Sequence, residues 1–556
     1  MRRHVIIGAV LTAWLALSAT GAGAQLTHVP TANPKIPGVV QPNVLSPELA
    51  EVVRAQGAML LENPASPAKY YGYNDDKPNL MPLPPPAALK DEAHKTEPDK
   101  NTYLRLQQQT GADPEYDYGT HFLFQGHESG PGTFPNQQGY ITRINLDADV
   151  AHRVTLMATT DVDGKPLPTF DGSTWYPWAH RLLFTAELGN IGGVWQATLD
   201  VPSKVEDISG AFGRGGYEGI QPDSDGNLWI VEDAGGANGT TNPQAKQPNS
   251  FVYRFIPYNR SDLKAGGKLQ VLAVKSKAHA GNIVFNNPSP DVDITSQDIR
   301  DLHTYGLVFD TQWLTIHDTA VNGNAPFDAN LLAKGVGTPF KRPENGVFRP
   351  GTKFREFYFT ETGDTNALTQ VGSAGGGFGG LFTITQKRPS DSQGTLSLFF
   401  LGDVAHTGLD NIAFLTKDLL VAVEDAGDGL HGQRNALDSA WLFDARSDYS
   451  NPATQPIRIL AQGRDPSATI DSAVPGTGND GDNEITGFHV SDGDPGTGGI
   501  LGAKNPKPFD GKWRVFYTQQ HGDNRTYEII PNPSVAEAIT GDGHDGHDGH
   551  NGGDRD

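Results

Sequence analysis

The stretch that decides the fold runs from Tyr217 to Gly236 and reads YEGIQPDSDGNLWIVEDAGG. Two apolar runs flank the segment Pro222 to Asn227, PDSDGN, whose Pro, Asp, Gly and Asn residues are the ones that reverse a chain. The pattern predicts a hairpin of two strands whose turn lies about midway between Glu218 and Glu232. Such a hairpin brings both carboxylates to the same end.

The same pattern recurs later in the chain. Leu409 to Gly429 reads LDNIAFLTKDLLVAVEDAGDG, and placing Asp410 on Glu218 also places Glu424 on Glu232, because each pair is 14 residues apart. Both copies have an acid, a turn, an apolar strand and then Glu-Asp-Ala-Gly. A match of this quality indicates an internal repeat.

Looser copies extend the repeat along the chain. A third copy, Pro343 to Asp364, has Glu344 and Glu361 in the two acid places, and a fourth begins at Asn483 with NEITGFHV. Two earlier segments supply only the second half of the pattern. Together they give six polar positions at strand ends: Glu128, Glu187, Glu232, Glu361, Glu424 and Gln519.

These repeats predict an all-β fold, a six-bladed β-propeller with irregular insertions and an N-terminal extension. The 66 Gly and 40 Pro residues favour many short strands joined by turns. A solenoid of β units is the alternative. The long insertions Ala237 to Asn249 and Ser276 to Asp301 favour the propeller, because they make the repeat intervals uneven.

The two ends of the chain do not resemble the repeats. A basic start, an apolar run shorter than the ~20 residues that cross a bilayer, and a small-residue ending predict an export signal and a periplasmic or extracellular protein. The tail, rich in His, Asp and Gly, cannot build a core, although its HDGHDGH motif could bind a transition metal. We expect a signal peptide at 1–24, an irregular N-terminal extension at 25–110, the propeller at 111–535 and a disordered tail at 536–556.

Composition limits the function classes. Cysteine is absent, which excludes disulfides and thiolate catalysis, and the formal charge of −22 argues against nucleic acid or anionic lipid as a partner. The charge is compatible with cation binding. The sequence leaves the oligomeric state open.

Repeated acids at matching strand ends of a propeller would gather around one mouth of its channel. Carboxylates crowded there require cations, and oxygen ligands suit calcium, magnesium or manganese, with iron(III) also possible. The alternative is that each acid caps its own turn. Arg342 lies two residues before Glu344, so in an extended strand the two side chains share a face, where the guanidinium could hold phosphate.

With these residues assembled, the chain resembles the PhoX-type alkaline phosphatases, a family of exported six-bladed propellers. The resemblance is carried by GRGGYEGIQPDSDGNLWIVEDAGG from Gly213, KRPENG from Lys341, GLDNIAFLTKDLLVAVED from Gly408, and NEITG followed by FYTQQHGDNRTYEI. It implies a metal-dependent phosphomonoesterase with calcium and iron. It also implies the following roles: metal ligands at Glu187, Glu218, Glu344 and Glu484, further candidate ligands at Asp410 and Glu424, and a phosphate-holding Arg342.

One position departs from that family. PhoX-like enzymes have a cysteine iron ligand directly before the acid, where this chain has Ala186 before Glu187. Calcium is therefore the expected cofactor and iron is less favoured. A small phosphorylated substrate is the expected partner, with no nucleic acid and no membrane. The alternatives are a non-catalytic calcium-binding propeller and another calcium-dependent hydrolase, a lactonase or a phytase-like enzyme.

Four histidines near the repeat ends, His127, His406, His431 and His521, could act as general acids or support the ligands. Satisfied structural histidines are the alternative. Trp175 and Trp178 are expected in the core rather than at a substrate entrance.

Overall fold

The structure is a computed structural model that describes residues 26–65, 68–73, 96–129, 138–468 and 481–535. The predicted signal peptide at 1–24 and the His-rich tail at 536–556 lie outside the described residues. The same is true of the proline-rich stretch from Lys77 to Leu89. Among the described residues, no helix has the length and apolar character needed to span a membrane.

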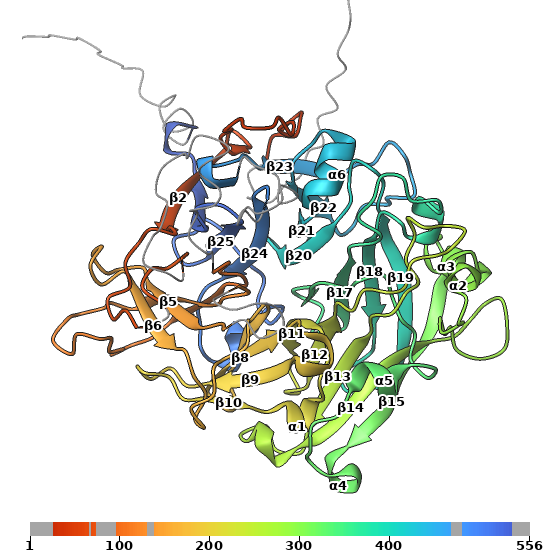
Figure 1. Ribbon diagram of the computed structural model, residues 1–556, viewed down its shortest axis with the longest axis horizontal. Coiled ribbons are helices and arrows are strands. Elements are labelled where there is room, and N and C mark those ends of the chain that lie inside the picture. The colour runs from red at the N-terminus through yellow and green to blue at the C-terminus, as the bar shows by residue number, and fades with distance from the viewer. Residues whose placement is uncertain (1–25, 66–67, 74–95, 130–137, 469–480, 536–556) are drawn as a thin grey trace, which may run out of the picture.

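Most of the regular elements in the described chain are strands, in five antiparallel sheets arranged around a centre like the blades of a propeller (Figure 1). This confirms the all-β, propeller-like prediction. The first sheet contains β3 (Thr102–Arg105), β4 (His121–Gly126), β5 (Ile141–Asn145) and β6 (Val154–Ala158). The second contains β7 (Ser173–Tyr176), β8 (Arg181–Ala186), β9 (Gly193–Ala197) and β10 (Val205–Asp207).

The third sheet has nine strands and contains two consecutive meanders. One meander is β11 (Tyr217–Pro222), β12 (Leu228–Glu232), β13 (Val252–Pro257) and β14 (Gly267–Val274). The other is β16 (Gly346–Phe348), β17 (Glu356–Glu361), β18 (Gly380–Thr385) and β19 (Gln393–Leu401). The long strand β15 (Val308–Asp318) pairs with both β14 and β19, so the described sheets number five rather than the six expected.

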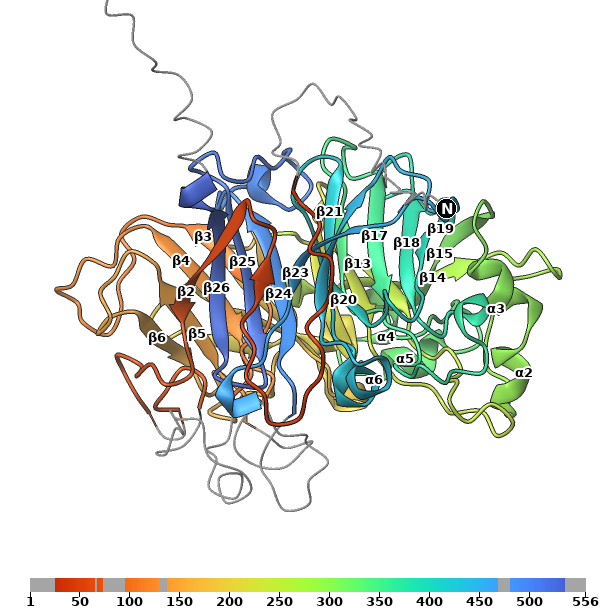
Figure 2. The ribbon, with the colours of Figure 1, turned by 90° about the horizontal axis from the view of Figure 1, so that it is seen from above.

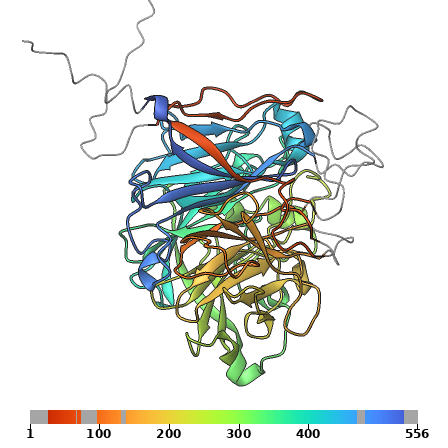
Figure 3. The same cartoon turned by 90° about the vertical axis from the view of Figure 1, so that its left-hand side faces the viewer.

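The last two sheets are completed by strands from the start of the chain. The fourth sheet has β20 (Leu409–Phe414), β21 (Leu419–Glu424), β22 (Ser439–Asp444), β23 (Ile457–Ala461) and the short β1 (Val44–Leu45). The fifth has β24 (Glu484–Ser491), β25 (Arg514–Gln520), β26 (Arg525–Pro531) and β2 (Leu49–Ala55). In Figures 2 and 3 β2, in red, lies along blue C-terminal strands. The segment expected to be an irregular extension therefore supplies β1, β2 and β3, and β2 joins the two ends of the described fold.

The first strands of the meanders face the centre and contact one another in a closed order: β3, β7, β11, β16, β20, β24 and β3 again. Glycine allows this close approach at Gly172, where a Cβ atom would lie 1.9 Å from the carbonyl oxygen of Glu218 in the next meander. Side chains that precede or begin these six strands are thereby brought to one central place.

The hydrophobic core lies between neighbouring sheets. Phe124 and Ile141 of the first sheet pack in one buried cluster with Leu182, Phe184 and Trp195 of the second. Alternating apolar residues of each strand thus cover the facing sheet. Trp175 is buried, as expected, and its indole nitrogen donates to the Pro495 carbonyl, whereas Trp178 is only partly buried at the edge of two clusters.

Helices are short and lie in the connections. They are α1 (Ser209–Phe212), α2 (Pro290–Ile294), α3 (Gln297–Leu302), α4 (Thr319–Asn322), α5 (Ala329–Ala333) and α6 (Gly427–Arg434). The insertion from Ser276 to Asp301 contains α2 and most of α3 at the outside of the nine-stranded sheet (Figure 1).

The two clearest repeats have the same register. Tyr217 pairs with Glu232 and Leu409 pairs with Glu424, and in both hairpins a bulge follows, at Glu218–Gly219 and at Asp410–Asn411. This confirms the predicted hairpins and the alignment of the two copies. Each bulge changes the direction in which the side chain of the first acid of the repeat points.

Candidate metal centre

Six acids lie in or just before the six central strands, one for each meander. They are Asp99, Asp171, Glu218, Glu344, Asp410 and Glu484. Glu128 and Glu187 follow the second strands of the first two meanders, β4 and β8, and extend this set. The ring of first strands therefore gathers acids from segments far apart in the sequence.

The acids form three groups that share members. In each group one oxygen from every carboxylate lies within 4.8 Å of the others. The groups are Asp99, Glu128 and Asp171; Asp171, Glu187 and Glu218; and Glu218, Glu344 and Asp410. Because Asp171 and Glu218 each belong to two groups, the carboxylates form one continuous chain.

Burial and mutual repulsion disfavour the charged forms of these acids. The pKa of Glu218 is raised well above its usual value, first by burial and then by the charges of Asp171, Glu344 and Glu187. Burial, followed by Asp233 and Glu344, does the same to Glu187. Ionising all the carboxylates of a group therefore costs the most free energy when no cation is bound.

The contacts within the groups fit a bound cation. An oxygen of Asp171 lies within 4.8 Å of oxygens of Asp99 and of Glu218, and carboxylates this close require either a shared proton or a positive ion between them. Nearby, Asp233 Oδ1 is buried without a hydrogen-bond partner. The ligands available are carboxylate oxygens, which suit hard cations such as calcium.

Arg342 borders these groups. Its Nη2 atom lies 2.6 Å from Asp233 Oδ2 and 3.3 Å from Glu344 Oε1, and its Nε donates to Asp233 at 2.8 Å. Arg342 has φ +61°, so the expected extended strand is wrong here, but the left-handed turn still brings the guanidinium to Glu344. About a fifth of its side chain remains exposed, 22%. The Arg342 side chain is therefore partly open to solvent.

Three second-strand acids are held elsewhere. Glu424 pairs with Arg434 at 2.9 Å and accepts from Trp441 Nε1 at 3.0 Å, so it belongs to none of the carboxylate groups found among the described residues. Glu232 accepts from the Tyr253 hydroxyl, and Glu361 accepts from His303. Glu424, a further candidate ligand from the sequence, therefore has its partners on its own sheet and on α6.

Glu484 lies at the edge of the site. Its pKa is raised well above the usual value by burial first and then by Asp425, while His521 at 3.1 Å opposes this rise. It is not in the three carboxylate groups. Among the four candidate histidines, His521 is the one that contacts a predicted site acid, whereas His127 is buried between the hydroxyls of Thr96 and Thr142.

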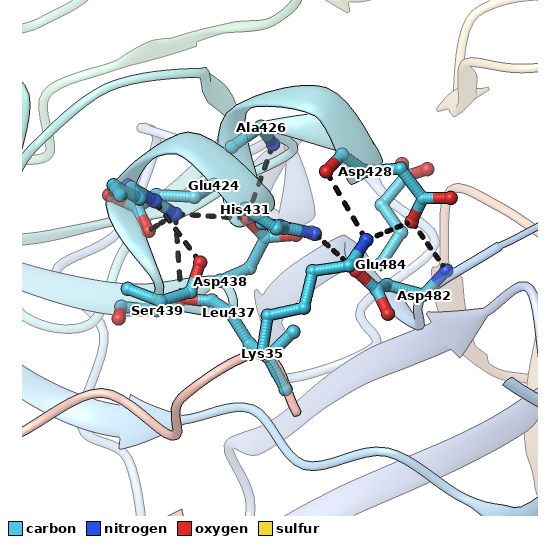
Figure 4. Close-up of polar contacts among 12 residues, drawn as sticks. Lys35, Glu424, Ala426, Asp428, His431, Leu437, Asp438, Ser439, Asp482 and Glu484 are labelled. Carbon is cyan, nitrogen blue, oxygen red and sulfur yellow. Dashed lines mark hydrogen bonds and ion pairs between the residues drawn. The ribbon is translucent and has the colours of Figure 1, made fainter. Parts of the chain in front are cut away.

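A fourth group that could hold an ion, Asp428, His431 and Asp482, lies beside α6. Figure 4 shows that Lys35 reaches into it, with Nζ 2.7 Å from Asp482 and 3.2 Å from Asp428. His431 donates to Asp482 and to Asp438. Burial lowers the pKa of His431, but the charge of Asp438 and the hydrogen bonds to both acids outweigh it and raise the pKa to about 9. Protein cations thus fill this group, which ties the start of the chain to α6.

Sequence reasoning missed Asp99, Lys100 and Asp171. The signal for Asp171 is present in FDGSTW, where an acid followed by glycine lies just before β7. Glu218 in YEGIQP is likewise an acid followed by glycine, near the start of β11. Asp99 is followed by a lysine rather than a glycine, and it lies inside the segment expected to be irregular. Ala186 is buried at the end of β8, directly before Glu187, and offers no ligand atom.

Comparisons with known proteins agree with this architecture. Residues 244–435 match the family model described as alkaline phosphatase PhoX. The solved structure of Pseudomonas fluorescens PhoX in complex with vanadate, a transition state analogue, matches over 90% of this chain and 98% of that chain, with a TM-score of 0.51 and 12% identity. A periplasmic gluconolactonase from Pseudomonas aeruginosa covers 87% of this chain and all of its own, with a TM-score of 0.32 and 12% identity.

No curated protein sequence matches the chain. The identity to the solved structures is low, so their likeness shows the fold alone. On these findings, residues 244–435 are similar to the PhoX-type alkaline phosphatase family, and the fold of most of the chain is similar to that of a solved PhoX.

Proposed function

We propose that this chain is an exported, metal-dependent phosphatase that hydrolyses phosphomonoesters at the central carboxylates. The observation that carries the proposal is the contact of Arg342 with Glu344, which joins an anion-binding guanidinium to the chain of carboxylate groups. The match of residues 244–435 to the alkaline phosphatase PhoX family model supports the reaction class. A metal held by these acids next to Arg342 would place positive charge on two sides of a phosphate.

The proposed ligands are the carboxylates that the structure groups together. They are Glu187, Glu218, Glu344 and Asp410, as expected from the sequence, with Asp99, Glu128 and Asp171 added. Glu484 would support the site from its edge through His521. We infer calcium as the metal, because oxygen ligands predominate and Ala186 cannot supply the thiolate of a family iron site.

Arg342 is the proposed phosphate ligand. Asp233 holds its Nε and Nη2 atoms, which fixes the direction of the guanidinium before substrate arrives. Lys246, from the insertion Ala237 to Asn249, lies close enough for Arg342 to lower its pKa after burial does, so a second cation borders the same place. When bound, the metal would polarise phosphoryl oxygens and offset their negative charge during transfer.

We also infer that the fold is a propeller of six blades. The support is the closed ring of six first strands together with the two four-stranded meanders inside the nine-stranded sheet. In this interpretation β15 is an insertion that hydrogen-bonds two neighbouring blades along their outer edges. The blade count explains why six first-strand acids converge.

The test is an assay of the purified chain against three substrate classes, with calcium, with iron and after chelation. The proposal expects hydrolysis of p-nitrophenyl phosphate that depends on metal, and little hydrolysis of a lactone. Turnover of the lactone alone would identify the other calcium-dependent hydrolase. Calcium binding without turnover of a phosphomonoester, a phosphodiester or a lactone would indicate a non-catalytic propeller.

A further inference from the structure

A buried lysine lies among the proposed metal ligands. Lys100 lies two residues before β3 and is 3% exposed, and its ammonium donates to Asn411 Oδ1 at 2.6 Å. No carboxylate of the described residues lies within ion-pair distance of this ammonium. A buried ammonium with one acceptor is unusual, because two of its three donors are left without a described partner.

Asn411 connects this ammonium to the carboxylates. Its amide nitrogen donates to both oxygens of Asp410, each at 2.9 Å, while its oxygen accepts from Lys100. The same nitrogen lies 3.2 Å from the Thr486 hydroxyl, which in turn donates to Asp99. The amide orientation is therefore fixed, with its positive end toward the acid and its negative end toward the lysine.

The backbone around Lys100 is also fixed. The Ser173 hydroxyl donates to the Lys100 carbonyl at 3.1 Å and lies 2.8 Å from the Thr102 hydroxyl. Hydrogen bonds of this network thus involve the central strands β3, β7, β20 and β24. The ammonium has little freedom to leave the ring.

Burial lowers the pKa of Lys100, and the charges of four acids oppose this and favour the ammonium, in the order Asp410, Asp99, Glu218 and Asp171. Every one of the three carboxylate groups contains at least one of these acids. The lysine is therefore a positive charge common to the whole chain of carboxylates. A divalent cation approaching from its side would be repelled by the ammonium while it was attracted by the acids.

We propose that Lys100 is an internal counter-cation that excludes metal from the space between Asp99 and Asp410 and so directs metal to Glu187, Glu218 and Glu344. This inference rests on the proposed binding of metal by the carboxylates. It adds that Lys100 limits how many metal ions the carboxylates bind. Lys100 is a positioning residue, because it acts on the metal through charge and through Asn411.

The test compares calcium binding by the full chain and by Lys100→Met, measured by calorimetric titration and by elemental analysis after gel filtration. Removing the ammonium is expected to tighten calcium binding about tenfold or to add one calcium per chain. Lys100→Arg keeps the charge and is expected to match the parent. Unchanged or weaker calcium binding by Lys100→Met would overturn the inference.

Lys341→Met is the matched control, because Lys341 is equally buried but pairs with Asp364 at 2.8 Å, outside the carboxylate groups. It is expected to lower thermal stability without changing the calcium stoichiometry. If Lys100→Met does not fold, a calcium-loaded crystal structure of the parent decides the question. An ion bound by both Asp99 and Asp410, or no ion at the carboxylates, contradicts the inference. Ions bound only by Glu187, Glu218 and Glu344, without one that joins Asp99 to Asp410, support it.

The outcome is separable from that of the proposed function. A parent chain that binds calcium as described but does not hydrolyse p-nitrophenyl phosphate would leave the role of Lys100 standing and remove the phosphatase assignment. Metal-dependent hydrolysis by the parent, together with the same calcium affinity in Lys100→Met, would support the phosphatase assignment and remove the role of Lys100.

Discussion

Glu218 and Glu232 lie at the same end of one hairpin but have different surroundings. Tyr217 pairs with Glu232, and the bulge that follows directs Glu218 to the carboxylates of Asp171 and Glu187, whereas Glu232 accepts from Tyr253 within its own sheet. The first acid of the repeat therefore belongs to the central site, and the second belongs to the packing of the blade.

This division predicts different effects for two charge-neutral substitutions. Glu218→Gln is expected to weaken calcium binding about tenfold or more, because it removes a charged ligand common to two carboxylate groups. Glu424→Gln is the matched control, since Glu424 holds the same place in the second repeat as Glu232 in the first. It should leave calcium binding unchanged and cost about 2 kcal/mol of unfolding free energy, because Arg434 loses a charged partner. Calorimetric titration and thermal unfolding measure the two effects.

Chelation is expected to destabilise the protein most near neutral pH. Burial and neighbouring charges raise the pKa values of Asp171, Glu187 and Glu218, so without metal the folded state holds protons that the unfolded state releases. The stability of the metal-free protein therefore rises as pH falls toward the unfolded values, and it is lost as pH rises. Differential scanning calorimetry at pH 5 and pH 7.5 should show a smaller calcium-dependent rise in Tm at the lower pH. An equal rise at both would contradict a carboxylate site.

Glu232 predicts a second, metal-independent pH effect. Burial raises its pKa to about 7, against the hydrogen bonds of Asn330 and Tyr253. Between its unfolded pKa and about 7 the folded state binds one more proton, so the unfolding free energy of the parent relative to Glu232→Gln should fall by about 1.4 kcal/mol per pH unit as pH rises. Denaturant unfolding of both proteins in excess calcium measures this difference. A difference that does not change with pH would show that Glu232 is ionised throughout.

Arg342 is expected to act on substrate rather than on stability. Arg342→Ala should reduce kcat/KM for p-nitrophenyl phosphate about 100-fold, because a guanidinium that faces the phosphate is lost. Arg349→Ala is the control: Arg349 also pairs with two carboxylates, Glu356 and Asp418, but at the other end of β16. A loss of the same size in both variants would indicate general destabilisation rather than phosphate binding.

The sequence predicted the parts of this molecule that depend on local pattern. The turn chemistry of Pro222 to Asn227 and its repeat near Asp418 were sufficient to predict two hairpins and their shared register. Acids recur at fixed places in the repeat, and the resemblance to the PhoX-type family implied Glu187, Glu218, Glu344 and Asp410 as ligands. The structure brings these four into linked carboxylate groups.

What the sequence did not predict depends on contacts between distant segments. β15 joins two meanders through pairing with both neighbours, which no local pattern indicates. Glu424 has the same spacing as Glu232, but its partner Arg434 comes from α6 after the repeat has ended. Asp99 and Lys100 enter the ring only because β3 closes it against β7 and β24.

The central claim is that the carboxylates of the ring hold the metal on which phosphomonoester hydrolysis depends. The most direct measurement is the initial rate of p-nitrophenyl phosphate hydrolysis as a function of free calcium, for the parent chain and for Glu218→Gln. We predict a rate that rises from near zero to a plateau in the parent and requires about tenfold more calcium in the variant. A rate that does not depend on calcium, or the same calcium dependence in both proteins, would contradict the account.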